Sequence, residues 1–145
     1  MDAFTVALRP WGLYLAVRRP LERGERDEFA VLFERACQVL CTREPGWGAI
    51  ADLQGARLAE MEGERLMAYM HLARQLGNGR AATVVTSRPD ADAFAAALAA
   101  AGLGGTTRIL VAEDVGIGVT HAAYEWVLRG VEPLAHTQHR VTRTG

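Results

Sequence analysis

The sequence predicts a single α/β domain with a mixed, mostly parallel sheet of about five strands and about four helices. Two observations lead to this prediction. Short apolar or β-branched runs alternate with longer segments in which apolar residues recur every three or four positions, and glycine or proline separates them. Strands that alternate with helices in this way imply right-handed crossovers and a sheet that is mainly parallel.

The length and composition limit the class of protein. The 145 residues are about one domain by the usual prior and suffice to bury one core. The formal net charge of −1 excludes a strongly basic nucleic-acid binder as a global description. We expect no signal peptide, no membrane span and no disulfide framework, because long apolar runs are absent and there are only two cysteines. The expected location is the cytoplasm.

An antiparallel hairpin is expected at the start of the chain. Residues 4–8 and 13–18 have the pattern of short strands, and Pro10 and Gly12 between them are typical turn residues. Pro20 ends the second strand. The hairpin is expected to form one edge of the sheet.

A helix over residues 21–41 follows the hairpin. Phe29, Phe33 and Leu40 fall on one arc of this helix, with charged and polar residues on the rest of its circumference. The Glu-Pro-Gly sequence at 44–46 ends the helix and leads the chain into the sheet.

The stretch 47–55 is interpreted as a buried central strand and the turn that follows it. It is uncharged up to Asp52, and Gly55 lies in the turn that leads to a helix over residues 58–76, which the glycines at 77 and 79 end. The carboxyl ends of strands are where ligands bind in open α/β sheets. We therefore expect any functional site to lie near Asp52.

The remaining elements complete the alternation. They are a strand at 81–86, an alanine-rich helix from about 87 to 101, a strand at 107–112 and a helix at 118–129. The domain is expected to span residues 1–130. Residues 131–145 are polar and lack periodicity, which indicates a flexible tail.

Two short motifs resemble a known family. The strand ending Asp52-Leu53-Gln54-Gly55 and, near the end of the chain, the set Asp114, Ala122, Ala123 and Trp126 are similar to STAS domains. These include bacterial anti-sigma-factor antagonists and STAS-like proteins of unknown function. The resemblance covers about residues 4–130. It implies a STAS-like fold and a regulatory module that binds a protein or a ligand without catalysis.

The phosphorylated serine of the signalling members is missing. Their Asp-Ser-Ser-Gly sequence corresponds here to Glu60-Met61-Glu62-Gly63, so the resemblance carries over no phosphorylation switch. Glu62 places a permanent charge where a phosphate would lie, and mimicry of the phosphorylated state is one hypothesis. A glutamate that stabilises the helix dipole is the simpler interpretation.

The candidate ligand- or partner-binding residues are Asp52, Gly55, Glu60, Glu62 and Gly63. Each has a structural alternative: the Asp52 carboxylate is expected first to accept backbone N–H bonds from its own turn. The glutamates between Glu60 and Glu64 could form an acid–base or metal cluster with Asp52, but the nearby arginines favour an ordinary charged helix start. No catalytic residue, cofactor or metal site is therefore predicted.

Cysteine and histidine offer weak signals. Cys37 and Cys41 lie one helical turn apart and are interpreted as half-buried packing residues. His136 and His139 have a spacing found in metal sites, but they lie in the polar tail without acidic neighbours. The sequence 116–118 lacks the third glycine of a dinucleotide-binding loop.

The last helix carries a second apolar stripe. Tyr124, Val127, Leu128 and Val131 lie on a side different from its expected inner face. Contiguous exposed apolar surface often marks association, so this stripe predicts a homodimer or a partner surface. Scattered surface apolar residues in an alanine-rich chain are the alternative.

Three functions remain open from the sequence. The preferred one is a STAS-like module that binds a protein or a small apolar or anionic ligand at the Asp52 strand end. The second is a small α/β enzyme that uses Asp52 and the Glu60–Glu64 helix start. The third is a carrier of a lipid-like ligand, suggested by Met61, Met67 and Met70. Most of these methionines are better explained as core residues, and Met67 is the one most expected to reach the surface. A carrier should have a deep apolar cavity between a helix and the sheet.

Overall fold

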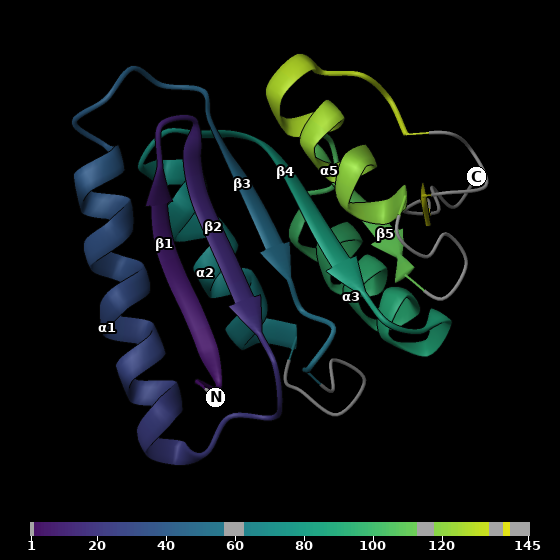
Figure 1. The fold of residues 1–145 in the computed structure, drawn as a ribbon, viewed down its shortest axis with the longest axis horizontal. Helices are drawn as coiled ribbons and strands as arrows, with labels where there is room; N and C mark the ends of the chain where they lie inside the picture. The colour runs from purple at the N-terminus through teal and green to yellow at the C-terminus, as the bar shows by residue number, and fades with distance from the viewer. Residues whose placement is uncertain (1, 57–62, 113–117, 134–137, 140–145) are drawn as a thin grey trace.

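The computed structural model describes residues 2–56, 63–112, 118–133 and 138–139. Its elements follow the predicted order (Figure 1). They are β1 (Phe4–Arg9), β2 (Gly12–Val17), α1 (Arg23–Leu40), β3 (Trp47–Asp52), α2 (Gly63–Gln75), β4 (Asn78–Val85), α3 (Arg88–Ala101), β5 (Thr107–Val111), α5 (Gly118–Arg129) and β6 (Gln138–His139).

The strands of the sheet stand side by side in chain order, from β1 to β6. The four strands β2 to β5 are parallel, while β1 and the two-residue β6 pair antiparallel at the two edges. The mixed, mostly parallel sheet with an antiparallel hairpin at the N-terminal edge is thereby confirmed. β3 is a central strand, as predicted, and Asp52 is its last residue.

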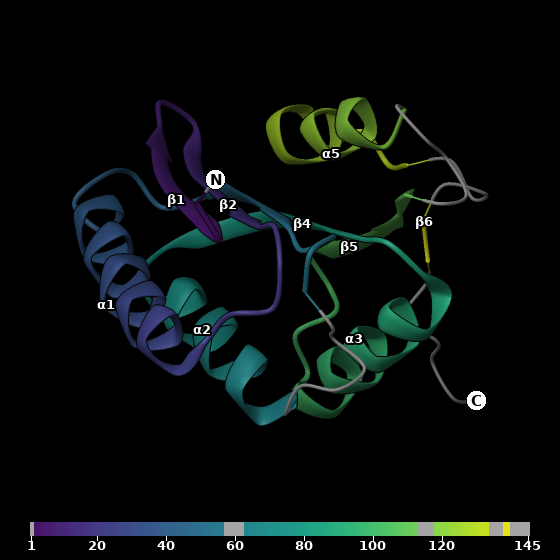
Figure 2. The same ribbon diagram turned by 60° about the horizontal axis from the view of Figure 1, so that its bottom comes forward.

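Helices cover both faces of the sheet, but unequally. Figure 2 shows α1, α2 and α3 on one face and, among the helices of the described residues, only α5 on the other. Two apolar clusters match these layers, one built with α1, α2 and α3 and a smaller one centred on Ile50, Ala123 and Trp126. The three crossover helices share a face because strands added in chain order with crossovers of one hand always place the helix on the same side.

Local signals fix the ends of the helices. Glu22 and Glu25 form a capping box at the start of α1. The Glu22 carboxylate accepts the Glu25 backbone N–H, and the Glu25 carboxylate accepts the Glu22 backbone N–H. Ser87 accepts the Asp90 N–H at the start of α3, and Gly102 ends that helix with φ +70°. Glycine adopts this left-handed backbone conformation without steric cost because it has no Cβ.

The start of β4 and part of the C-terminal segment differ from the prediction. β4 begins at Asn78, three residues early, because Asn78 pairs with Trp47 and its Nδ2 donates to the Trp47 carbonyl at 3.0 Å. The stop signal after α2 is therefore supplied by Gly77 (φ +110°), and Asn78 and Gly79 belong to the strand. At the other end of the chain, Gln138 and His139 in the polar tail hydrogen-bond to β5 as an edge strand.

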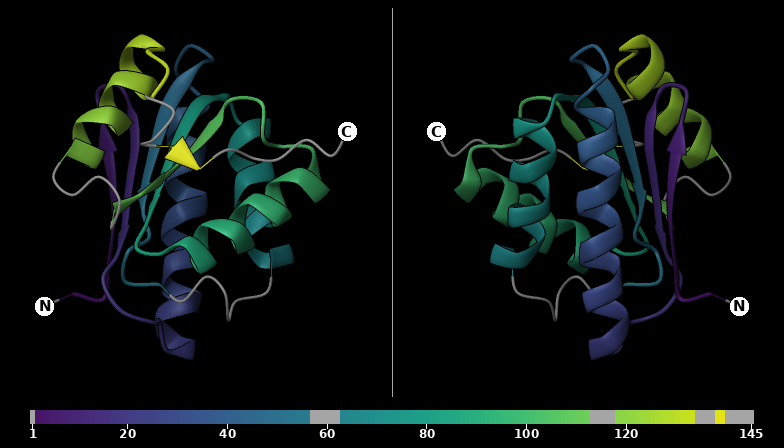
Figure 3. Two further views of the ribbon diagram at one scale, coloured as in Figure 1. Left: turned by 90° about the vertical axis from the view of Figure 1, so that its right-hand side faces the viewer. Right: turned by 90° about the vertical axis from the view of Figure 1, so that its left-hand side faces the viewer.

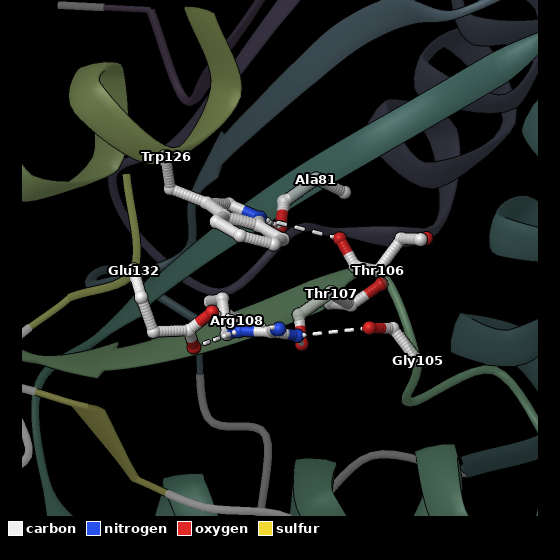
Figure 4. A network of polar contacts seen from close by, with 7 residues as sticks. All are labelled: Ala81, Gly105, Thr106, Thr107, Arg108, Trp126 and Glu132. Carbon is white, nitrogen blue, oxygen red and sulfur yellow. Dashed lines mark hydrogen bonds and ion pairs between the residues drawn. The ribbon is translucent and has the colours of Figure 1, made fainter. Parts of the chain in front are cut away.

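The α5 face is held by a polar and aromatic network around Trp126 (Figure 4). The Trp126 indole N–H donates to the carbonyls of Ala81 (3.1 Å) and Thr106 (3.2 Å). The Arg108 guanidinium lies 4.0 Å from the Trp126 ring centroid and forms an ion pair with Glu132. This network joins α5 to β4 and β5, so it anchors the helix rather than forming a ligand site.

Candidate functional site

A cavity of about 340 Å³ lies between the sheet and helices α1 and α2, on the side away from α5. Its volume falls within the range of small-molecule sites. Most of its wall is aliphatic or aromatic. The lining residues on the sheet side are Leu13, Leu15, Val17, Ala49, Ala51, Ala81, Ala82 and Thr83, and those on the helix side include Phe29, Phe33, Leu66, Tyr69, Met70 and Ala73.

Small side chains in two neighbouring strands create this cavity. Ala49 of β3 pairs with Ala81 of β4, and Ala51 pairs with Thr83, so four small residues lie together on the helix-covered face. Buried parallel strands usually carry Val, Ile and Leu there.

Aromatic rings from the two helices close the cavity opposite the sheet. The Tyr69 ring of α2 meets Phe29 and Phe33 of α1 edge to face, with centroids 5.4 and 5.0 Å apart. Phe29 in turn meets Phe4 of β1 edge to face at 5.4 Å. These contacts hold α1 and α2 at a fixed separation, so the cavity has a rigid roof.

The mouth of the cavity lies at the carboxyl edge of the sheet. Leu21 and Leu53, which follow the ends of β2 and β3, line it together with Arg26 and Arg65 in the first turns of α1 and α2. Both arginines are exposed although they line the cavity, which places them at its opening. The sequence predicted a site at this edge of the sheet.

Two buried polar residues of β4 also line the cavity. Thr83 is 3% exposed. Asn78 is 8% exposed and uses its Nδ2 to donate to the Trp47 carbonyl. A polar group in a mostly apolar wall is the kind of group that orients a bound molecule.

Asp52, the leading sequence candidate, faces the other side of the sheet. It alternates with Ala51 along β3 and shares the α5 side with Ile50, so it does not line the cavity. Its Oδ1 accepts the Gln54 backbone N–H at 3.2 Å, which is the structural role expected of it. Burial raises the pKa of Tyr14, and the charge of Asp52 raises it further.

Gly55 has a steric role in the turn after β3. Its N–H donates to the Val17 carbonyl at 2.9 Å, and a Cβ built on it would lie 2.0 Å from the carbonyl carbon of Arg18. Glycine is therefore required for this close approach. Gly63 begins α2, while Glu60, Met61 and Glu62 lie outside the described residues.

The other candidates are dispersed over the molecule. Cys37 is fully buried and Cys41 exposed, so neither is half-buried, and both thiols are free. Met67 is 6% exposed and belongs to the core, contrary to expectation, whereas Met70 lines the cavity. His136 lies outside the described part of the chain. Within that part, no group of three potential metal ligands occurs, and no helix is long and apolar enough to span a membrane.

The apolar stripe expected on the last helix is divided. Leu128 and Val131 are 46% and 49% exposed. Val127 does not belong to an exposed stripe, because it is buried (5% exposed) next to Gly48. Tyr124 is half-buried and meets the Trp11 ring edge to face at 5.6 Å. The remaining exposed pair is small, and its role in association stays a prediction.

Comparison of the chain with protein-family models, with curated proteins and with solved structures gives no match. The function must therefore be argued from the cavity. The signal that could have revealed it in the sequence is the pattern Ala49-Ile50-Ala51 in β3 followed by Ala81-Ala82-Thr83 in β4. The small residues Ala49, Ala51, Ala81 and Thr83 share the cavity face, and only the pairing of β3 with β4 shows that they lie next to one another.

Proposed function

We propose that this protein is a non-catalytic module that binds a small apolar or amphipathic molecule in the cavity between α1, α2 and the sheet. The observation that supports this most strongly is the in-register set of small residues under a fixed aromatic roof. A carrier of an apolar ligand needs unfilled apolar volume of this kind.

The chemistry of the wall favours binding over catalysis. Among the described residues that line the cavity, none is an acid, a histidine or a cysteine. Tyr69 and Thr83 line the cavity and carry hydroxyl groups, but a hydroxyl nucleophile is activated by an adjacent base, and no described lining residue supplies one. The resemblance of the sequence to STAS domains supports the same choice, because it implies a regulatory or binding role.

A neutral fluorescent probe tests this function without assuming a headgroup. We expect N-phenyl-1-naphthylamine to bind the protein saturably with one site per chain. Ala51→Leu adds side-chain volume at the cavity wall and should lower the affinity for the probe at least about tenfold. Ala68→Leu makes the same change at an exposed position of α2 and should leave binding unchanged. Equal binding by wild type and Ala51→Leu, or no saturable binding at all, would overturn the proposal.

We also propose that Leu128 and Val131 form an association surface, since both lie exposed near the end of α5. Sedimentation of the wild type and of Leu128→Glu at increasing concentration tests this surface. A wild type that associates while the variant stays monomeric supports it. A wild type that is monomeric at every concentration rejects it.

A further inference from the structure

We infer that the ligand of this cavity is an amphipathic anion, with an apolar chain inside and one carboxylate or phosphate head held at the mouth by Arg26 and Arg65. The inference rests on the proposed function, because it specifies which apolar molecules the cavity selects. It adds a charged subsite whose residues come from two different helices.

The two arginines reach the mouth from corresponding positions. Arg26 lies in the first turn of α1 and Arg65 in the first turn of α2. Figure 3 shows these helices side by side and running in the same direction. Each arginine lines the cavity and is also exposed, so the aliphatic stem lies along the wall and the charged end lies at the opening.

Both guanidinium groups are available. In the described part of the chain neither Arg26 nor Arg65 forms an ion pair or a side-chain hydrogen bond. The nearby Glu25 is already paired, through two hydrogen bonds of 2.7 and 2.8 Å, with Arg19. Two unpaired guanidinium groups at one opening favour an anion, which each can bind through two N–H groups.

Among the described residues that line the cavity, Arg26 and Arg65 are the charged ones, and both are basic. Asp27 is exposed and does not line the cavity. Burial raises the pKa of Tyr69, the charge of Arg65 lowers it, and that of Asp27 raises it.

Displacement of the neutral probe by ligands of equal chain length and different headgroups tests whether the cavity prefers an anionic headgroup. We expect decanoate or decyl phosphate to displace N-phenyl-1-naphthylamine at a concentration at least about tenfold lower than decanol, since charge-assisted contacts exceed neutral ones. Comparison of the two anions identifies the preferred head. The advantage over decanol should shrink as salt rises, because the contacts are exposed.

Charge variants locate the subsite. Arg26→Gln combined with Arg65→Gln should abolish the advantage of the anions over decanol, while Asp27→Asn should increase that advantage. Arg35→Gln, at an exposed position of α1 that does not line the cavity, is the matched control and should change nothing.

The outcomes separate this inference from the proposed function. If decanol displaces the probe as well as the anions do, or if the double arginine variant keeps the anion advantage, the charged subsite is rejected and the apolar cavity stands. If the probe itself does not bind, the proposed function fails.

Discussion

The rings of Phe29 and Tyr69 meet edge to face, with their centroids 5.4 Å apart and their planes at 88°. This contact joins α1 to α2 across the cavity and, with Phe33, forms its roof. Aromatic pairs of this geometry contribute about 0.5–1.5 kcal/mol each beyond the area they bury. The roof therefore stabilises the fold and shapes the cavity at the same time.

Removal of the Tyr69 ring should destabilise the fold. We expect Tyr69→Ala to lower the free energy of unfolding by about 2–3 kcal/mol, below the usual range for a fully buried aromatic because Tyr69 is half-buried. Tyr69→Phe keeps the ring and should cost less than about 1 kcal/mol. Urea denaturation measures both. A Tyr69→Ala variant as stable as Tyr69→Phe would show that the ring contacts do not hold the helices.

Gly48 and Val127 are predicted to be coupled. A Cβ built on Gly48 would lie 2.1 Å from Cγ1 of the buried Val127, so Gly48→Ala should cost about 1–3 kcal/mol by overpacking. In Gly48→Ala/Val127→Ala the added methyl occupies the space that valine leaves. A double-mutant cycle in urea should therefore give a total cost well below the sum of the single costs. Additive costs would show that Gly48 is required for another reason.

The Trp126 network should stabilise the α5 face without affecting the ligand. Trp126→Phe removes the indole N–H that donates to Ala81 and Thr106 and keeps an aromatic ring beside Arg108. We expect a loss of about 2 kcal/mol in the free energy of unfolding and an unchanged affinity for the neutral probe. If the variant is fully folded and yet binds the probe more weakly, the probe lies on the α5 side of the sheet.

The fold was largely predictable because each element carries its own local signal. The span of α5, Gly118–Arg129, follows from its glycine start and the apolar period after it. The start of β4 did not follow, since it depends on a hydrogen bond from Asn78 to Trp47, which is distant in sequence. The pairing of Gln138 and His139 with β5 is likewise a long-range contact in a segment without periodicity.

The sequence led only to the edge of the sheet at which the proposed site opens. A strand places successive residues on opposite faces of the sheet. Asp52 and Leu53 at the end of β3 therefore face opposite sides, and only Leu53 lines the cavity. Nothing in the sequence alone shows which face the larger helix layer covers. The cavity itself depends on the register that brings Ala49 to Ala81 and Ala51 to Thr83.

The pH dependence of stability should report the buried Cys37. Burial raises the pKa of its thiol from 9.0 to about 12, with a smaller contribution from Cys41. As the pH rises from about 9 to about 12, the unfolded chain releases this proton and the folded chain retains it, so stability falls. Tyr14 and Tyr69 have raised pKa values and act in the same direction.

A comparison of variants isolates the cysteine. Between pH 8 and pH 10 the free energy of unfolding should fall less steeply for Cys37→Ala than for the wild type. Cys41→Ala, which removes an exposed thiol, should keep the wild-type slope. Identical slopes for the wild type and Cys37→Ala would indicate that the Cys37 thiol ionises as readily in the folded chain as in the unfolded one.

The most direct test of the central claim is an NMR measurement of where the ligand lies. With ¹³C-methyl-labelled methionine and isotope-labelled valine, decanoate should shift the Met70 methyl resonance and give nuclear Overhauser effects to it, because Met70 lines the cavity. The methyl groups of Val127, on the opposite face of the sheet, should not respond. Contacts from the ligand to Val127 and none to Met70 would contradict the assignment of the cavity as the binding site.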